Sequence, residues 1–411
     1  MTKDSELWDI LRSMGILMII LLLQPHTLGD ETRIQLNDPL IAKQQALFNK
    51  INVFEAWNTT RGDPNILVGI VDLGFDFFHP DLKSNLVPGF YASGGYHTEC
   101  YEIVAHGTLV ASIIAAKENN KIGMTGLAPR CRVLTASYGM IENKYGSLLR
   151  KFRQDHPEAG PGDKRWAKIM NERRNEIKNF GTKWTKYMTS SQAKAIRYLV
   201  DHKVRVINIS GYIQRDLCRS CPEAWQQLED AFEYAVKNDV VIVIGAGNDA
   251  VRAEGYPGNP NSMIVAGATM LNDTRWEEEF DFKGSSKIKQ GTNFGKRLTV
   301  MAPTENIQVC IPHEKRFYIT EDGPMGPAST ELKFEAMYEV EPNGATSSAA
   351  PIVTSLVALI YSVRPELDAK SVVDIIKQGC DDIGHKGYDI YTGYGRVNFG
   401  KTIKIAVTWR K

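Results

Sequence analysis

The sequence predicts an α/β fold in three layers, with a mostly parallel central sheet and helices on both of its faces. Short runs of β-branched and apolar residues, typical of strands buried on both faces, alternate with stretches of helical character. Such alternation is typical of a parallel sheet whose crossover connections are helices. No linker divides the 411 residues, so we expect one domain over residues 30–411.

The overall composition is that of an ordinary globular protein. Apolar residues make up 43% and charged residues 24% of the chain. The 49 lysines and arginines nearly balance the 48 acidic residues. The net charge therefore indicates neither nucleic acid nor an anionic membrane surface as a partner.

The first 29 residues have the character of a targeting segment. The apolar run from Ile16 to Leu23 is too short to span a bilayer comfortably but suits the core of a signal peptide. The small residues Thr27 and Gly29 suit cleavage before Asp30, although the acidic residues near the start are unusual for such a peptide. We expect export to the cell exterior or a periplasm, with no stable membrane insertion after cleavage. An uncleaved membrane anchor or a buried N-terminal helix is the alternative.

The first half of the expected domain begins with a docking helix or turn at residues 44–57. Residues 66–71 are a predicted buried strand that ends at Asp72, and residues 106–116 are a predicted helix whose first turn carries His106. Ligands and catalytic groups collect at the carboxyl ends of strands in open α/β sheets, so Asp72 is a candidate functional acid. Taken alone, Asp72 could equally cap a loop, and His106 could be a structural histidine.

The alternation of strands and helices continues towards the C-terminus. We expect further strands over residues 132–137, 204–209, 240–244, 262–268 and 298–302, and helices over residues 192–202 and 225–238. Two of these strands end at glycine-containing turns, Ser210-Gly211 and Gly245 to Asn248.

Residues 141–190 differ from the rest of the chain. They carry twelve basic and six acidic residues, and Gly160-Pro161-Gly162 interrupts them. We expect two charged surface helices here. This basic helical insertion is either a solvated surface element, or a lid or a site that binds a partner.

Six cysteines are present, and Cys218-Arg219-Ser220-Cys221 places two of them in a CxxC pattern. Without a second pair of ligands, this pattern is only weak evidence for zinc or a redox site. A local disulfide or two free thiols are the other interpretations.

The stretch from Gly344 to Pro351 combines small residues with the hydroxyl of Ser347, and an apolar run follows from Ile352 to Tyr361. This pattern predicts the N-terminal cap of a buried helix or, alternatively, a nucleophile on a tight turn at a helix N-terminus. In the second case, unpaired N–H groups and the helix dipole would stabilise an oxyanion.

A serine nucleophile needs partners elsewhere in the chain. An imidazole must accept its proton, and a buried carboxylate must orient that imidazole. His106 and Asp72 have these side chains, and Asn248 adds an amide donor that suits an oxyanion hole. The chain order Asp, His, Ser is one of the known orders for such a triad.

Several separate motifs resemble those of the subtilisin-like serine proteases (subtilases), in the same order, from about Leu47 to about Lys404. The motifs are Val68 to Asp76, His79 to Leu82, His106-Gly107-Thr108, Ala246-Gly247-Asn248, Tyr256-Pro257, Met301-Ala302-Pro303, Thr346 to Pro351 and Gly393 to Asn398. Together they are far more specific than any one of them. The resemblance implies the three-layer subtilisin-like fold and a secreted serine endopeptidase that acts on polypeptides.

The resemblance also implies a role for each matching residue. Asp72 would orient His106, His106 would act as general base and then general acid, and Ser347 would attack the scissile carbonyl. Asn248 and the Ser347 backbone N–H would form the oxyanion hole. The residues expected to bind the substrate are Ser210, Gly211, Tyr212, Ala246, Gly247 and Gly255. Tyr212 stands where relatives usually have glycine, so it could narrow or cap the primary specificity pocket.

The implied chemistry requires no cofactor. The resemblance further implies a structural calcium ion, with oxygen ligands from Asp81 and Asn120 and from carbonyls around Ile122 and Met124. Hard oxygen ligands on a loop suit this ion.

Two other functions remain open. The fold could serve binding alone, as a pseudoprotease whose cleft is blocked by residues 141–190 or by Tyr212. The chain could also be an exopeptidase with a lidded cleft. All four expected catalytic side chains are present, which favours the endopeptidase.

Overall fold

The computed structural model describes most of the chain from residue 34 onwards. The described residues are 34–92, 106–138, 164, 165, 168, 174–211, 215–255, 257–280, 288–311, 314, 315, 319, 320, 323, 324, 330, 331 and 337–410. The chain divides into two units, residues 1–35 and 36–411, and the second holds all the described helices and strands. The expected signal peptide at residues 1–29 and the start of the expected insertion, residues 141–163, lie outside the described residues.

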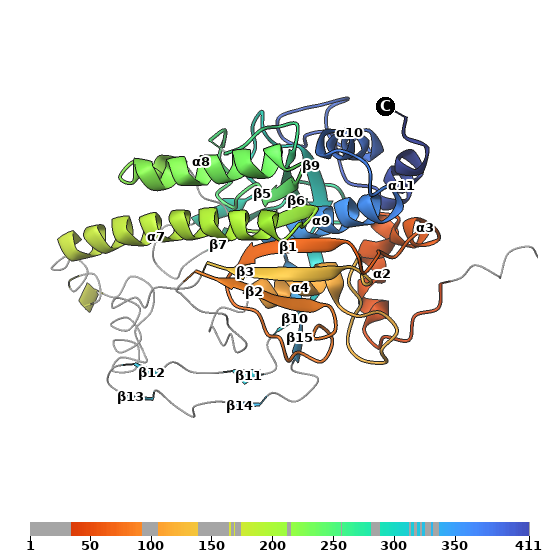
Figure 1. Cartoon of the computed structure of the whole chain (residues 1–411), viewed down its shortest axis with the longest axis horizontal. Coiled ribbons are helices and arrows are strands. Elements are labelled where there is room, and N and C mark those ends of the chain that lie inside the picture. The colour runs from red at the N-terminus through yellow and green to blue at the C-terminus, as the bar shows by residue number, and fades with distance from the viewer. Residues whose placement is uncertain are drawn as a thin grey trace, which may run out of the picture. The chain divides into compact units, whose positions relative to one another are not determined.

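A seven-stranded sheet forms the centre of this unit (Figure 1). Its strand order is β2-β3-β1-β4-β5-β6-β9, and every neighbouring pair is parallel. The strands are β1 (Leu67–Asp72), β2 (Leu86–Tyr91), β3 (Arg132–Ser137), β4 (Val206–Ile209), β5 (Val241–Gly245), β6 (Met263–Thr269) and β9 (Val300–Pro303). The predicted parallel sheet is confirmed, and β2 is a strand that the sequence patterns did not predict.

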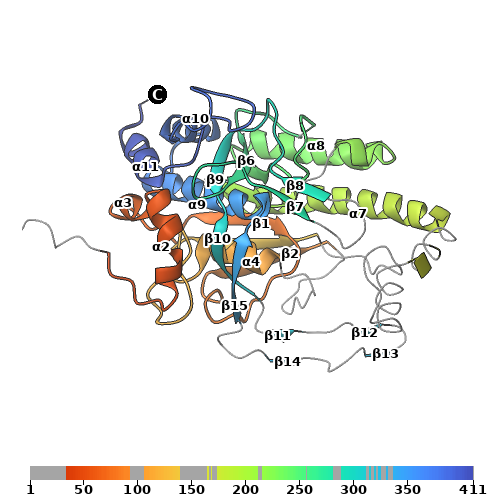
Figure 2. The same ribbon diagram turned by 180° about the vertical axis from the view of Figure 1, so that it is seen from behind.

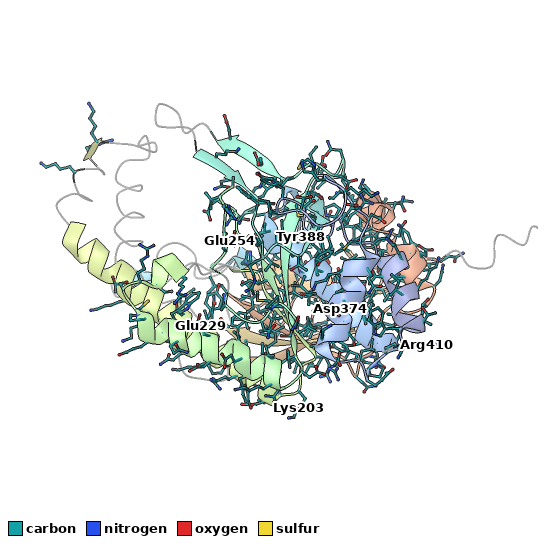
Figure 3. All side chains as sticks on the ribbon, turned by 90° about the horizontal axis from the view of Figure 1, so that it is seen from above. Lys203, Glu229, Glu254, Asp374, Tyr388 and Arg410 are labelled. Atoms are coloured by element: carbon teal, nitrogen blue, oxygen red, sulfur yellow. The ribbon has the colours of Figure 1, made fainter. Side chains whose placement is uncertain are left out.

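Helices cover both faces of the sheet. Figure 1 shows α7 (Arg174–Asp201) and α8 (Pro222–Lys237) in front of the strands, and Figure 2 shows α4 (His106–Ala115) and α9 (Thr346–Val363) on the opposite face. Lys203, which follows α7, and Glu229, within α8, lie on the α7–α8 side of the sheet (Figure 3). The three predicted layers are therefore present.

The helix α9 is the most deeply buried of these elements. It is long and apolar enough to cross a membrane, but 83% of it is buried inside the protein. Residues Ala349 to Tyr361 pack against β4, β5, β6 and α4. The apolar run after Ser347 therefore forms a core helix, as its sequence predicts.

The other helices lie around this core. They are α2 (Ile41–Lys50), α3 (Val53–Trp57), the short 3₁₀ helix η1 (Arg215–Cys218), α10 (Ala369–Gly379) and α11 (Phe399–Thr408). The docking element expected at residues 44–57 is thus two short helices, α2 and α3.

Four antiparallel strand pairs complete the described elements. They are β7 (Glu277–Phe280) with β8 (Ile288–Gly291), β10 (Glu305–Cys310) with β15 (Tyr338–Asn343), β11 (Glu314–Lys315) with β14 (Thr330–Glu331), and β12 (Ile319–Thr320) with β13 (Gly323–Pro324). None of these strands has the continuous apolar run by which the parallel strands were predicted.

Two expectations need correction. The helix expected over residues 192–202 is the C-terminal part of α7, which begins in the expected insertion at Arg174. This helix runs without a break through residue 190, where the expected insertion ends. Cys218 and Cys221 are free, buried thiols, so the disulfide interpretation is not supported.

Candidate active site

Asp72 is the last residue of β1, at the carboxyl edge of the sheet. The strand β1 pairs with β3 on one side and β4 on the other, so this position lies well inside the sheet. The Asp72 side chain is only 1% exposed. Its Oδ1 accepts a hydrogen bond from the Leu73 N–H at 2.7 Å and another from His106 Nδ1 at 2.7 Å.

His106 is the first residue of α4, and the first turn of that helix is anchored to the residues that follow β1. The Gly107 N–H donates to the Leu73 carbonyl oxygen at 2.7 Å, and the Thr108 N–H donates to the Gly74 carbonyl oxygen at 3.1 Å. A Cβ at Gly107 would lie 2.6 Å from the Gly74 carbonyl oxygen, so this close approach requires glycine. The His-Gly-Thr motif therefore places the imidazole against Asp72.

The contact with Asp72 determines both the tautomer and the basicity of His106. A carboxylate accepts hydrogen bonds, so Nδ1 carries the proton and Nε2 is the acceptor in the neutral ring. The negative charge of Asp72 raises the pKa of His106 above its usual value, against the opposing effect of burial, and Glu341 adds to the increase. The imidazole remains 31% exposed and can therefore meet a substrate.

Ser347 is the second residue of α9 and is held at the end of β4, the neighbour of β1. The Ser210 hydroxyl donates to the Ser347 carbonyl oxygen at 2.8 Å, and the Ser347 hydroxyl lies 3.5 Å from the Ser210 carbonyl oxygen. Since the ends of parallel neighbouring strands meet at one edge, Ser347, Asp72 and His106 lie at the same edge of the sheet. The Ser347 N–H is in the first turn of α9, where N–H groups have no acceptor within the helix.

Asn248 follows β5, and its amide orientation is determined by Thr346. The Asn248 Oδ1 accepts from the Thr346 N–H at 3.1 Å and from the Thr346 hydroxyl at 2.7 Å. A backbone N–H can only donate, so the oxygen of this amide faces Thr346 and the NH₂ group faces away. Gly247 has φ 93°, a conformation that favours glycine, and its N–H donates to the Thr346 hydroxyl at 3.1 Å.

The expected substrate-binding residues lie on the same strand ends where the structure describes them. Ser210 and Gly211 follow β4, and Ala246 and Gly247 follow its neighbour β5. Gly255 lies against Arg215, since a Cβ there would be 3.4 Å from the Arg215 Cβ. These turns flank Ser347, but Ala246 itself is fully buried and can offer a ligand only its backbone. Tyr212 lies outside the described residues.

The side-chain oxygens expected to bind calcium, those of Asp81 and Asn120, accept hydrogen bonds from donors within the protein. Asp81 is fully buried. Its Oδ1 accepts from the Asn120 side-chain NH₂ at 2.6 Å, and its Oδ2 accepts from the Met124 N–H at 2.9 Å and from the Tyr338 hydroxyl at 3.3 Å. The Asn120 oxygen accepts from the Ile122 N–H at 2.9 Å, so it is the NH₂ end that faces Asp81.

This arrangement does not fit a calcium ion. A calcium site needs converging oxygens, whereas N–H and O–H donors converge on Asp81. Burial raises the pKa of Asp81 to about 7, and the negative charge of Asp38 adds to the increase. In the described part of the chain, no group of three His, Cys, Asp or Glu side chains could hold a metal. The ligand set expected at Asp81 and Asn120 is thus not supported.

Two residues near Ser347 were missed by sequence reasoning. Thr346 orients Asn248, although it stands in the motif that was already singled out. Glu341, on β15, is half-buried and near enough for its charge to raise the pKa of His106. An acidic residue six positions before a candidate nucleophile is the only signal in the sequence that could have indicated Glu341.

Comparisons with known proteins identify the family of this chain. A sequence model described as the Subtilase family matches residues 63–395. The thermophilic serine proteinase of Bacillus sp. (strain AK1) is 25% identical over 345 residues, 84% of this chain and 63% of that protein. The major intracellular serine protease of Bacillus subtilis (strain 168) is 26% identical over 320 residues, 76% of this chain and 73% of that protein.

A solved structure supports the fold independently. The crystal structure of fervidolysin from Fervidobacterium pennivorans matches with a TM-score of 0.58 at 22% identity, over 93% of this chain and 48% of that one. Fervidolysin is described as a keratinolytic enzyme related to subtilisin. At this level of identity, the match bears on the fold alone.

Proposed function

Because the chain belongs to the subtilase family, we propose that it is a serine endopeptidase that hydrolyses polypeptides through Asp72, His106 and Ser347. The observation that carries this proposal is the 2.7 Å hydrogen bond between the buried Asp72 carboxylate and His106 Nδ1. This hydrogen bond lies at the same edge of the sheet as Ser347. Subtilases need no cofactor for catalysis, and this mechanism uses none.

Acylation begins at the Ser347 hydroxyl. With the Nδ1 proton directed to Asp72, Nε2 of His106 is free to accept the Ser347 proton as Oγ attacks the scissile carbonyl. The imidazolium that forms is stabilised by the Asp72 charge, which already raises the pKa of His106. It then donates its proton to the leaving amine, and the peptide C–N bond breaks.

The negative charge that develops on the carbonyl oxygen needs donors. The Asn248 NH₂ group, directed away from Thr346, and the Ser347 N–H at the start of α9 supply them. Water then attacks the acyl-enzyme with His106 as base, and Ser347 leaves as the product acid is released.

Two further parts of the proposal concern other segments. We propose export of the chain on the basis of the apolar run from Ile16 to Leu23. Recovery of the protein outside the cytoplasm, with an N-terminus near Asp30, is expected, and retention of the full N-terminus inside the cell would contradict it.

We also propose that the basic segment over residues 141–190 restricts which substrates reach Ser347. Deletion of residues 143–173 leaves α7 intact and should widen peptide specificity; unchanged specificity would exclude this role.

A fluorophosphonate probe tests the chemistry directly. We expect the purified protein to be labelled, and the Ser347→Ala variant to remain unlabelled. Cleavage of a peptide library at internal bonds would then identify an endopeptidase, whereas release of terminal residues only would identify an exopeptidase. A folded wild-type protein that is not labelled would indicate a pseudoprotease.

A further inference from the structure

Glu341 lies on the strand that runs directly into the nucleophile turn. It belongs to β15, where it pairs with Ile307 of β10. Three residues later, the Gly344 N–H donates to the Thr304 carbonyl oxygen at 2.7 Å, immediately before α9 begins at Thr346. The position of Glu341 relative to Ser347 is therefore set by a paired strand and an anchored turn.

The β10–β15 pair lies beside the helix that carries His106. The Cys310 N–H of β10 donates to the Ser112 hydroxyl of α4 at 3.0 Å, and β10 packs against α4 (Figure 2). This packing brings Glu341 within electrostatic range of the imidazole, since its charge raises the pKa of His106.

The Glu341 carboxylate is half-buried, and its charged neighbours among the described residues are His106 and Glu339. Burial raises its pKa, His106 lowers it, and the other charged neighbour is the like-charged Glu339. In the part of the chain that the structure describes, no lysine or arginine faces Glu341. Keeping a charged carboxylate partly out of water without a neighbouring cation costs free energy. A cationic group on a bound ligand would offset that free-energy cost.

The side of the cleft on which Glu341 lies follows from the topology. Ser210 and Asn248, at the ends of β4 and β5, contact the Ser347 turn from within the parallel sheet. The strand β15 belongs to a separate pair, and the other strand of that pair, β10, packs against α4. His106, at the start of α4, must face the leaving amine, because it delivers the proton to that amine.

We propose that Glu341 is a specificity-determining residue that selects a lysine or arginine side chain on the leaving-group side of the scissile bond. This inference rests on the proposed peptidase function and names the substrate class of the same site. The Glu341 carboxylate forms an ion pair with the cationic side chain when the peptide is bound, and the pair is lost when the amine product leaves.

Matched peptides test this selection. Two series should be compared by kcat/KM, identical except for lysine or glutamine at the first or second residue after the scissile bond. We expect the lysine peptide to be preferred about fivefold or more at one of the two positions, as for a partly buried ion pair. Glu341→Gln should remove this preference. Glu341→Lys should instead favour a third peptide that has glutamate at the same position.

Glu339→Gln is the matched control. Glu339 is exposed on the same strand, two residues away, and the strand alternation places it on the same face. This variant should retain the lysine preference. An equal preference in wild type and Glu341→Gln, with both labelled by the fluorophosphonate probe, would overturn this inference alone. A folded wild type that is neither labelled nor active would overturn the proposed function as well.

Discussion

The hydroxyl of Thr346 lies 2.7 Å from the amide oxygen of Asn248, and this bond determines which end of the amide can meet a substrate. Because the Thr346 N–H bonds to the same oxygen, the NH₂ group has to face the other way. The proposed oxyanion hole therefore depends on a residue that itself need not touch the substrate.

Asn248→Ala should reduce kcat strongly. Removal of one oxyanion donor costs about 10²–10³ in kcat in subtilisin, and we take the magnitude from that relative. The loss should appear in kcat more than in KM, because the donor acts on charge that develops in the transition state. Steady-state kinetics on one peptide measure it, with unchanged thermal unfolding as the control. A loss confined to KM would contradict the assignment.

Thr346→Val should lower kcat through Asn248. Valine has a similar shape but lacks the hydroxyl, so one of the two bonds that orient the amide is lost, and kcat should fall by about tenfold, equivalent to one hydrogen bond. Thr346→Ser keeps the hydroxyl and should restore most of the activity. In the Asn248→Ala background, Thr346→Val should have little further effect on kcat. Additive losses in the double variant would show that Thr346 acts independently of Asn248.

The pH dependence of kcat/KM should reflect His106. The imidazole must be neutral to accept the Ser347 proton, so activity is lost as pH falls through the pKa of His106. The charge of Asp72, and to a smaller extent that of Glu341, raises this pKa. The acidic limb of the kcat/KM profile should therefore have its midpoint above the usual pKa of histidine. Glu341→Gln should shift the limb to lower pH, while Glu339→Gln should leave it unchanged. A limb that does not move in Glu341→Gln would show that Glu341 does not act on His106.

Calcium chelation should leave stability unchanged. Donors occupy both Asp81 oxygens, so thermal unfolding measured with EDTA and with added calcium should give the same midpoint. Tyr338→Phe removes one of these donors from Asp81 and should lower the free energy of unfolding by about 1 kcal/mol in either condition. If calcium raised the midpoint of thermal unfolding and Asp81→Asn abolished that rise, Asp81 would be a calcium ligand after all.

Local patterns were sufficient for most of the fold and for the residue types of the candidate site. Six of the seven parallel strands overlap predicted strands, whereas β2, which Pro88 and Gly89 interrupt, was missed. The expected position of Asp72 follows from where its strand ends. The strands β10 and β15 could not be predicted in this way, because polar residues interrupt both of them. The length of α7 was missed because helical character continues through a boundary that charge composition indicated.

The sequence by itself determined that Asp72, His106, Asn248 and Ser347 are candidates for one chemistry, because each stands in a short motif at a strand end or helix start. Only the tertiary structure decided what these residues contact. The hydroxyl of Tyr338 reaches Asp81 across 257 positions of sequence and occupies an oxygen expected to bind calcium. Glu341 gains its importance from a strand pair that packs beside α4. Such contacts depend on how distant elements pack together, and no local pattern records that packing.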